Sequence, residues 1–169
     1  AIEFSDKLSK VGTQSIIGTQ INFKFEDTIG LLPLFALDED GYKKIIRLSS
    51  KSYLDNDKVS DPHLNINDLL KIDSSGISIF SGTVLGLFGK LFDKGKFSEI
   101  NNLYESLNKI FSDRFYLEIQ RHNDHNEKSF EQFNLDQSNN FKIPIIATNE
   151  VFYLTKDMHE AHDALICIG

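Results

Sequence analysis

The sequence contains no tryptophan, one cysteine, one methionine and three prolines. A single thiol cannot form an internal disulfide, so Cys167 excludes a disulfide-stabilised scaffold and favours a reducing, cytoplasmic setting. No apolar run approaches the ~20 residues of a membrane-spanning helix, and the first residues lack the charged and apolar blocks of a signal peptide. We therefore expect neither a disulfide-rich secreted protein nor a membrane partner.

Basic clusters are absent as well. The net charge is −7, and no run of lysine or arginine stands out. Proteins that bind nucleic acid on their own carry a basic stripe, because neutralising phosphates supplies most of their affinity. We expect this chain to meet DNA only as part of a larger protein.

What is present suffices for the core of one domain. The 169 residues are 40% hydrophobic and include 14 phenylalanines. Strands are predicted over 15–25, 31–37, 76–82, 113–122 and 141–148, and helices over 2–11, 66–72, 84–92, 96–111, 129–138 and 158–168, with another after Asp38. Because strands and helices alternate along the chain, the order favours an α/β fold with mostly parallel strands.

Two packing predictions accompany these elements. Asp38 is the expected N-cap of its helix, whose apolar stripe is predicted to comprise Tyr42, Ile45, Ile46 and Tyr53. Cys167 stands among apolar residues and is expected to be a small core side chain.

The stretch from Asp113 to His122 is the expected centre of the sheet. Side chains alternate between the two faces of a strand, so one face carries Phe115, Leu117 and Ile119 and the other carries Tyr116, Glu118, Gln120 and His122. A polar row that ends in histidine fits the mouth of an α/β barrel, where strand ends hold the site. A half-exposed strand with a wet face explains the same pattern.

Three short motifs have the residue types of functional sites. Gly89-Lys90 lacks the earlier glycine and the following Ser or Thr of a phosphate-binding P-loop, which excludes that motif. His159 and His162 are three residues apart, whereas a zinc-protease helix needs four, so a polar helix face is favoured. His122, Asp124 and His125 are a candidate metal cluster, with a solvated loop as the alternative.

Residues 113–122 resemble the polymerase and histidinol phosphatase (PHP) domain of bacterial DNA polymerase III alpha subunits. Residues 12–23 match its G-x-x-x-I-I-G strand, and 36–50 match its A-x-x-x-x-G-Y segment. Residues 78–95, 147–151 and 161–168 match later motifs in the same order.

The resemblance implies part of a distorted, TIM-like β/α barrel. It also implies that residues 1–169 are a single PHP domain fragment, because the family's opening strands, which carry about half of a multinuclear metal site, have no counterpart here. Several remaining ligand positions depart from the family. Gln20 occupies the position of an acid in the family, Leu31 and Phe152 occupy positions of histidines, and Glu150 occupies that of an aspartate. The histidine at the position of His122 is retained.

These departures define the expected function. The zinc, manganese or magnesium ions of the family are not expected here, because each ion needs several ligands in fixed geometry. The resemblance then implies a scaffold within a replicative DNA-directed DNA polymerase, a nucleotidyltransferase. Its expected partners are the other polymerase domains and a separate proofreading exonuclease subunit, and the fragment alone is expected to be inactive.

Two alternatives remain at this stage. One is a surviving metal-dependent phosphoesterase or 3′–5′ exonuclease that uses His122, Glu150 and Glu118. The other is an unrelated α/β enzyme of sugars or phosphates that shares only the barrel, because a fold does not fix a function.

Overall fold

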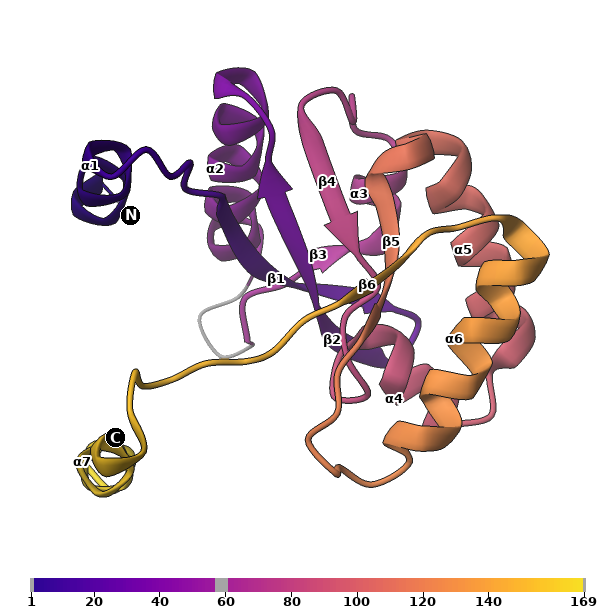
Figure 1. Ribbon diagram of the computed structural model, residues 1–169. Coiled ribbons are helices and arrows are strands. Elements are labelled where there is room, and N and C mark those ends of the chain that lie inside the picture. The colour runs from indigo at the N-terminus through magenta and orange to yellow at the C-terminus, as the bar shows by residue number, and fades with distance from the viewer. Residues whose placement is uncertain (1, 57–60, 169) are drawn as a thin grey trace.

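The structure is a computed structural model that describes residues 2–56 and 61–168. It has an α/β fold built on one six-stranded sheet, with strand order β3-β1-β2-β4-β5-β6 (Figure 1). The strands are β1 Ile17–Phe25, β2 Thr28–Ala36, β3 Leu64–Asn65, β4 Ile77–Phe80, β5 Phe115–Ile119 and β6 Ile145–Ala147. The helices are α1 Ile2–Lys10, α2 Glu39–Leu54, α3 Ile66–Leu70, α4 Leu87–Asp93, α5 Phe97–Phe111, α6 Glu127–Phe141 and α7 His159–Ile166.

The sheet is mixed rather than mostly parallel. β1 and β2 form an antiparallel hairpin, from the pair Ile17–Ala36 to the pair Phe25–Thr28, and β2 also runs antiparallel to β4. The other ladders, β1–β3, β4–β5 and β5–β6, are parallel. The sequence prediction missed the hairpin because Glu26-Asp27 lacks the glycine of a typical two-residue turn; Glu26 itself adopts the left-handed conformation, with φ of 52°.

A closed barrel stays a prediction. Hydrogen bonds join the strands from β3 to β6 in the order given, and no ladder between β3 and β6 is seen in the two described ranges. The parallel β4–β5–β6 part matches the expected architecture most closely, since helices α5 and α6 connect these strands.

Strand alternation separates a core face from a second face. Leu32 and Leu34 of β2 are fully buried in the hydrophobic core, together with apolar residues of α2, α4 and α5. Leu31 and Pro33, which alternate with these two residues, point to the opposite face, because neighbouring side chains of a strand alternate. The candidate site lies on that second face.

For helix α2, the predicted N-cap is correct and the predicted apolar stripe is largely wrong. The carboxylate of Asp38 accepts a hydrogen bond from the Gly41 amide at 2.7 Å, which confirms the N-cap. The buried stripe, however, consists of Gly41, Ile45, Leu48 and Ser52. Tyr42, Ile46 and Tyr53 are exposed. A Cβ at Gly41 would lie 1.8 Å from the Gly76 carbonyl oxygen, so only glycine fits where the helix meets the turn before β4.

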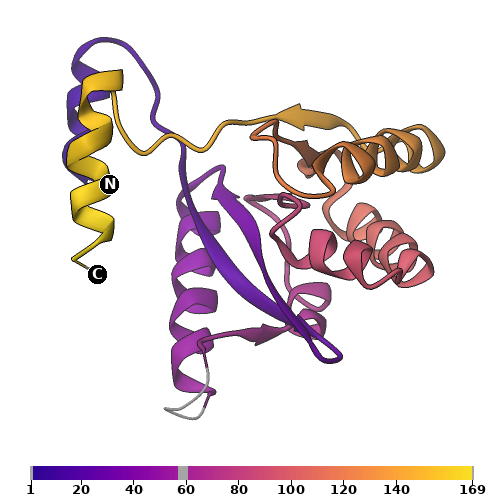
Figure 2. The same cartoon turned by 90° about the horizontal axis from the view of Figure 1, so that it is seen from below.

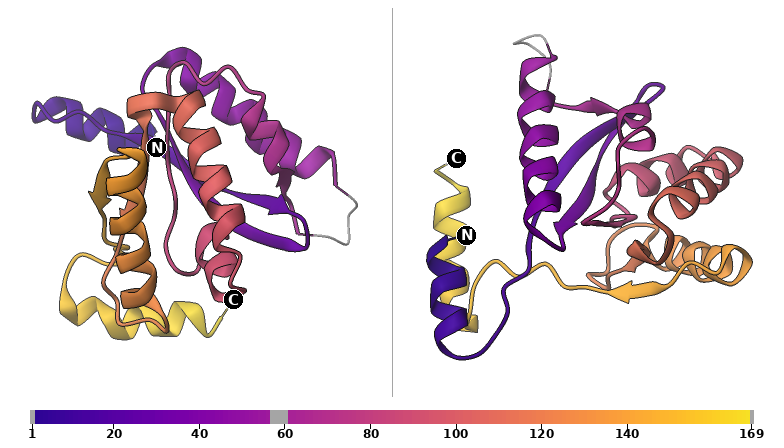
Figure 3. Two further views of the ribbon diagram at one scale, coloured as in Figure 1. Left: turned by 90° about the vertical axis from the view of Figure 1, so that its right-hand side faces the viewer. Right: turned by 90° about the horizontal axis from the view of Figure 1, so that it is seen from above.

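The first and last helices lie away from the sheet. Figures 2 and 3 show α1 and α7 beside the domain rather than on the sheet, and neither helix buries a residue. Cys167, directly after α7, is exposed, so its predicted place in the core is wrong. Apolar neighbours in sequence made the residue look buried, but the helix that carries it makes no core contact. No helix within the described ranges is long and apolar enough to cross a membrane.

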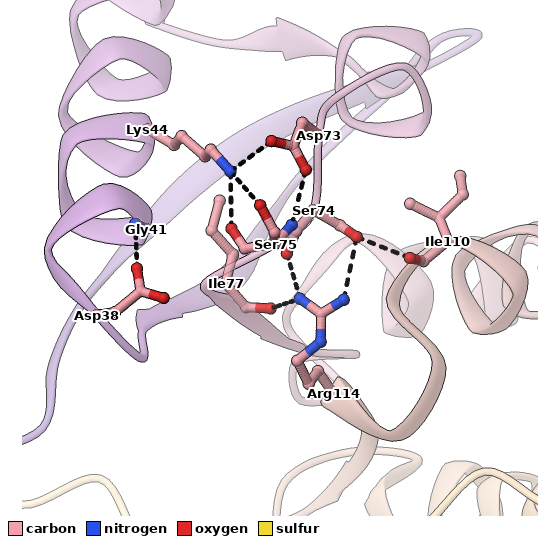
Figure 4. Close-up of polar contacts among 9 residues, drawn as sticks. All are labelled: Asp38, Gly41, Lys44, Asp73, Ser74, Ser75, Ile77, Ile110 and Arg114. Carbon is pink, nitrogen blue, oxygen red and sulfur yellow. Dashed lines mark hydrogen bonds and ion pairs between the residues drawn. The ribbon is translucent and has the colours of Figure 1, made fainter.

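A polar cluster around Arg114 ties the start of β5 to β4 (Figure 4). The guanidinium donates to the carbonyl oxygens of Ser74 and Ile77, the latter at 2.9 Å, and to Ser74 Oγ at 3.2 Å. Ser74 Oγ in turn donates to the Ile110 carbonyl at 2.7 Å. Beside it, Lys44 donates to Asp73 at 2.8 Å, which is the main reason that the pKa of Asp73 falls to about 2.

Candidate functional site

A cleft lies where the parallel strands β4, β5 and β6 end. It has a volume of about 140 Å³. Its lining comprises Gln20, Leu31 and Pro33 from the hairpin, Gly82, Thr83, Leu85 and Gly86 after β4, Glu118 and Gln120 from β5 and the loop after it, and Glu150 after β6. The carboxyl ends of parallel strands hold the sites of many α/β proteins.

Glycines allow the loop after β4 to close one wall of the cleft. Gly82 has φ of +77°, a conformation that L side chains rarely adopt. A Cβ at Gly86 would lie 2.9 Å from the Leu31 carbonyl oxygen. The loop therefore comes close to the β2 backbone, and its residues Thr83 and Leu85 line the cleft together with Glu118.

Glu118 is the buried acid of the cleft, with 5% of the residue exposed. Its Oε1 atom accepts hydrogen bonds from Thr148 Oγ1 and from Gln120 Nε2, the latter at 3.3 Å. No donor among the described residues makes a hydrogen bond to its Oε2 atom. One carboxylate oxygen is thus held by Thr148 and Gln120, which follow β6 and β5, and no described residue pairs the other.

Buried hydrogen bonds fix the backbone of Glu118 from behind. Its amide donates to Ser81 Oγ at 2.9 Å, and its carbonyl accepts from Asn134 Nδ2 at 3.4 Å. Asn134, which is fully buried on α6, also accepts from the Tyr104 hydroxyl at 2.9 Å. The backbone of the acid is therefore held by a buried network that includes α5, α6 and the residue after β4.

The environment of Glu118 favours its neutral form. Burial is the largest cause and raises the pKa of the Glu118 carboxyl, and the nearby Glu150 carboxylate raises it further. The hydroxyl of Thr148, the amide of Gln120 and the backbone of Gly82 oppose this in part. Among the described residues that line the cleft there is no lysine, arginine or histidine to balance either acid.

The structure brings together three of the five expected cleft positions. Gln20, Leu31 and Glu150 all line the cleft. His122 does not: its side chain is exposed, and only its backbone amide is used, donating to Glu127 Oε1 at 2.7 Å. Phe152 is also exposed and lies with its ring centroid 5.2 Å from that of His162.

The polar face predicted for β5 is half correct. Glu118 and Gln120 line the cleft, as alternation predicts, whereas His122, three residues after the end of β5, does not. Glu118 is also buried, so this face is not simply wet. Thr148 and the wall at 82–86 were not singled out from the sequence, because no local pattern links them to Glu118.

The other candidate motifs lie elsewhere. His122, Asp124 and His125 are exposed, and in the part of the chain that the structure describes no three histidine, cysteine or acidic side chains gather closely enough to hold a metal ion. His159 and His162 lie on α7 against Tyr153, with ring centroids 5.8 and 5.5 Å away. The cleft itself offers carboxylate and amide groups, which can bind cationic or hydrogen-bonding ligands.

Comparison with known proteins gives a consistent result. A model of the PHP domain family matches residues 1–122. The DNA polymerase III subunit alpha of Rickettsia bellii is 34% identical over 170 residues, which cover all of this chain and 14% of the relative. The proteins of the same name from Caulobacter vibrioides and Vibrio cholerae are each 30% identical, over 100% and 99% of this chain and 15% of each relative.

This chain therefore spans about one seventh of the length of these relatives. The family match covers most of the described strands, from β1 through β5, and it includes every residue that lines the cleft except Glu150. The match and the α/β structure agree, and the chain belongs to the PHP domain family.

Proposed function

We propose that this chain is the PHP domain of a replicative DNA polymerase III alpha subunit and that it has no catalysis of its own. In this account it is a scaffold and a docking surface for a proofreading exonuclease subunit. Nucleotidyl transfer and contact with DNA belong to other parts of the parent polymerase. The relatives support this proposal because they match the chain along its whole length.

The observation that carries the proposal is the donor set of the cleft. Gln20, Leu31 and Glu150 lie together there, and no imidazole lines it in the described residues. A multinuclear zinc or manganese site needs several charged or imidazole ligands for each ion. An apolar side chain at Leu31 and a neutral amide at Gln20 do not fit such a site. We infer that the cleft has lost multinuclear metal chemistry.

We also propose that residues 123–169 belong to the same domain, although the family match ends at residue 122. β6 pairs with β5, from Leu117–Ile145 to Ile119–Ala147. Phe130 of α6 is buried in the common core. Limited proteolysis tests this extent: a stable fragment that ends near residue 122 would contradict it.

A binding experiment tests the docking role. We expect the chain to form a stoichiometric complex with the proofreading exonuclease subunit of the same organism, seen by size-exclusion chromatography with light scattering at micromolar concentrations. An unrelated exonuclease is the control and should elute separately. Absence of any complex with the cognate subunit would contradict the docking role.

A second candidate function is a metal-dependent phosphoesterase or 3′–5′ exonuclease. The closeness of Glu118 and Glu150 in one cleft favours it, whereas the position of His122 outside the cleft speaks against it. Trimming of single-stranded DNA by the chain with manganese, abolished in Glu150→Gln, would establish this second function. We expect no trimming above the level of that variant.

A further inference from the structure

Helix α2 has a second apolar stripe, on its exposed side. Besides the buried stripe that packs on the sheet, three large side chains lie along one line of the helix at helical spacing: Tyr42, Ile46 and Tyr53. All three are exposed, and Tyr53 is 69% exposed. The solvent side of a surface helix is normally polar. A line of large apolar residues there indicates a contact that the sheet does not supply.

Helix α1 is amphipathic, yet it buries no residue. Its apolar stripe consists of Phe4 and Leu8, continued by Val11 directly after the helix, and Phe4 and Val11 are both exposed. The helix has only nine residues. Helices shorter than ~12–15 residues are marginal in water and depend on packing of an apolar face. The stability of α1 therefore calls for a surface on which this stripe is buried.

The chain holds α1 within reach of α2. Residues 11–16 connect α1 to β1, and a connector of this length spans up to ~20 Å when extended. Ile17, where β1 begins, pairs with Ala36, which lies just before the Asp38 cap of α2. Figures 1 and 3 show α1 on the side of α2 that faces away from the sheet. Gly12, with φ of +74° and open space around it, supplies a hinge.

We propose that α1 is a strap that docks on the exposed stripe of α2, antiparallel to it. In this arrangement Leu8 packs on Ile46, and Val11 lies near Tyr42, where the connector begins. At 1.5 Å per residue, α1 is about 13 Å long and the stripe from Tyr42 to Tyr53 is about 16 Å long, so the two faces match in length. The contact joins two parts of one chain, so it does not depend on the docking role proposed above.

The charges of the two helices favour the antiparallel direction. The first half of α1 is acidic and the second half is basic, with the order Glu3, Asp6, Lys7 and Lys10. Helix α2 begins with acids and continues with cations, in the order Glu39, Asp40, Lys43, Arg47 and Lys51. An antiparallel pair places the lysines of α1 by the acids of α2 and the acids of α1 by its cations, whereas a parallel pair opposes like charges. The helix dipoles also favour antiparallel packing.

Disulfide trapping tests the contact directly. The test variant carries Leu8→Cys and Ile46→Cys in a Cys167→Ser background, which removes the native thiol. We expect mild oxidation of the dilute protein to form an intramolecular disulfide, seen by intact-mass spectrometry of the monomer, because the two Cα atoms come within the ~7 Å that a disulfide needs. The matched control replaces Leu8→Cys by Ser9→Cys, on the far side of α1, and should form the bond about tenfold more slowly.

Hydrogen exchange gives a second readout that needs no thiol. Ile46→Asp places a charge in the exposed stripe without touching the core, because Ile46 is exposed. We expect the amides of α1 to exchange about tenfold faster in this variant, because a short helix frays when it loses its packing surface. Leu154→Asp, which changes an exposed leucine before α7, is the control and should leave α1 unchanged.

Three results would overturn the strap. The first is no disulfide between positions 8 and 46, and the second is an equal rate in the Ser9→Cys control, which would show that α1 moves without a preferred contact. The third is unchanged exchange of α1 in Ile46→Asp. Disulfide-linked dimers in place of a cross-linked monomer would also reject the strap, and would assign the exposed stripe of α2 to a second copy of the chain.

Discussion

Two polar clusters stand at opposite ends of β5, and they differ in how completely the chain pairs them. At the start of the strand, the Arg114 guanidinium donates to two carbonyls and a hydroxyl (Figure 4). Near its end, Glu118 is more deeply buried, yet its Oε2 atom has no described donor and the Glu150 carboxylate raises its pKa. The first cluster is complete within the chain. The second leaves a buried acid incompletely paired, and its charged form is therefore disfavoured.

The largest expected effect is a loss of stability when the Arg114 cluster, which is complete within the chain, is disrupted. Arg114→Met leaves the carbonyls of Ser74 and Ile77 without their donor in a part-buried position. We expect a loss of about 2–3 kcal/mol in the free energy of unfolding, because each unpaired buried acceptor is costly. Urea denaturation at neutral pH measures it. Arg121→Met is the control: Arg121 is 78% exposed and pairs with Glu131, so a loss as large as that of Arg114→Met would contradict the account.

The second prediction concerns the end of β5: the stability of Glu118→Gln should depend on pH differently from that of the wild type. The pKa of Glu118 is raised in the folded protein, so between the ordinary value of 4.5 and the raised value the folded state binds more protons than the unfolded state. Wild-type stability therefore falls as pH rises through that window, and the glutamine variant lacks this loss.

We therefore expect the stability of Glu118→Gln relative to wild type to increase with pH from 4.5 upward and then to level off. Urea denaturation over a pH series measures this difference. Glu160→Gln, exposed on α7, should run parallel to wild type. A difference that does not change with pH would show that the burial of Glu118 has no effect on its proton affinity.

Thr148→Val is expected to have a smaller effect on the same acid. The Thr148 hydroxyl donates to Glu118 Oε1 and lowers its pKa, so its removal should raise the pKa of Glu118 further. Carbon-detected magnetic resonance of the Glu118 carboxyl measures the change. Thr155→Val is the control, because Thr155 bonds to Asp157 instead: it should raise the pKa of Asp157 and leave Glu118 unaltered. An unchanged Glu118 in Thr148→Val would contradict the role of Thr148.

The smallest effect is expected at the exposed edge of the Arg114 cluster. Lys44→Met should return the pKa of Asp73 from about 2 toward its ordinary 3.8, with little change in stability at neutral pH because Asp73 is exposed. Titration of the Asp73 carboxyl by magnetic resonance measures it. Lys43→Met breaks only the pair with Glu39 and should not move Asp73. A similar pKa change in both variants would rule out a direct effect of Lys44.

The sequence predicted the elements better than their arrangement. Alternation located β5 and placed Glu118 and Gln120 on one face, and the Asp38 cap located the start of α2. The hairpin across Glu26-Asp27 was missed, because its turn lacks a glycine signature. Local apolar character also misplaced Cys167, since whether a helix packs on the core depends on contacts distant in sequence.

The site could be predicted only in part for the same reason. The family resemblance supplied Gln20, Leu31 and Glu150, which do meet in the cleft. It also supplied His122 and Phe152, whose side chains are exposed and do not line the cleft. The pairing of Glu118 with Thr148 depends on the β5–β6 register and has no local signature.

Metal content is the measurement that tests the central proposal most directly. Elemental analysis of the chain, purified without chelator and then dialysed, reports zinc, manganese and magnesium per polypeptide. The account predicts less than one tightly bound ion per chain, because Gln20 and Leu31 do not supply the ligands of a multinuclear site. Two or more ions per chain would contradict it, and would mean that the cleft still supports a metal centre in spite of Gln20 and Leu31.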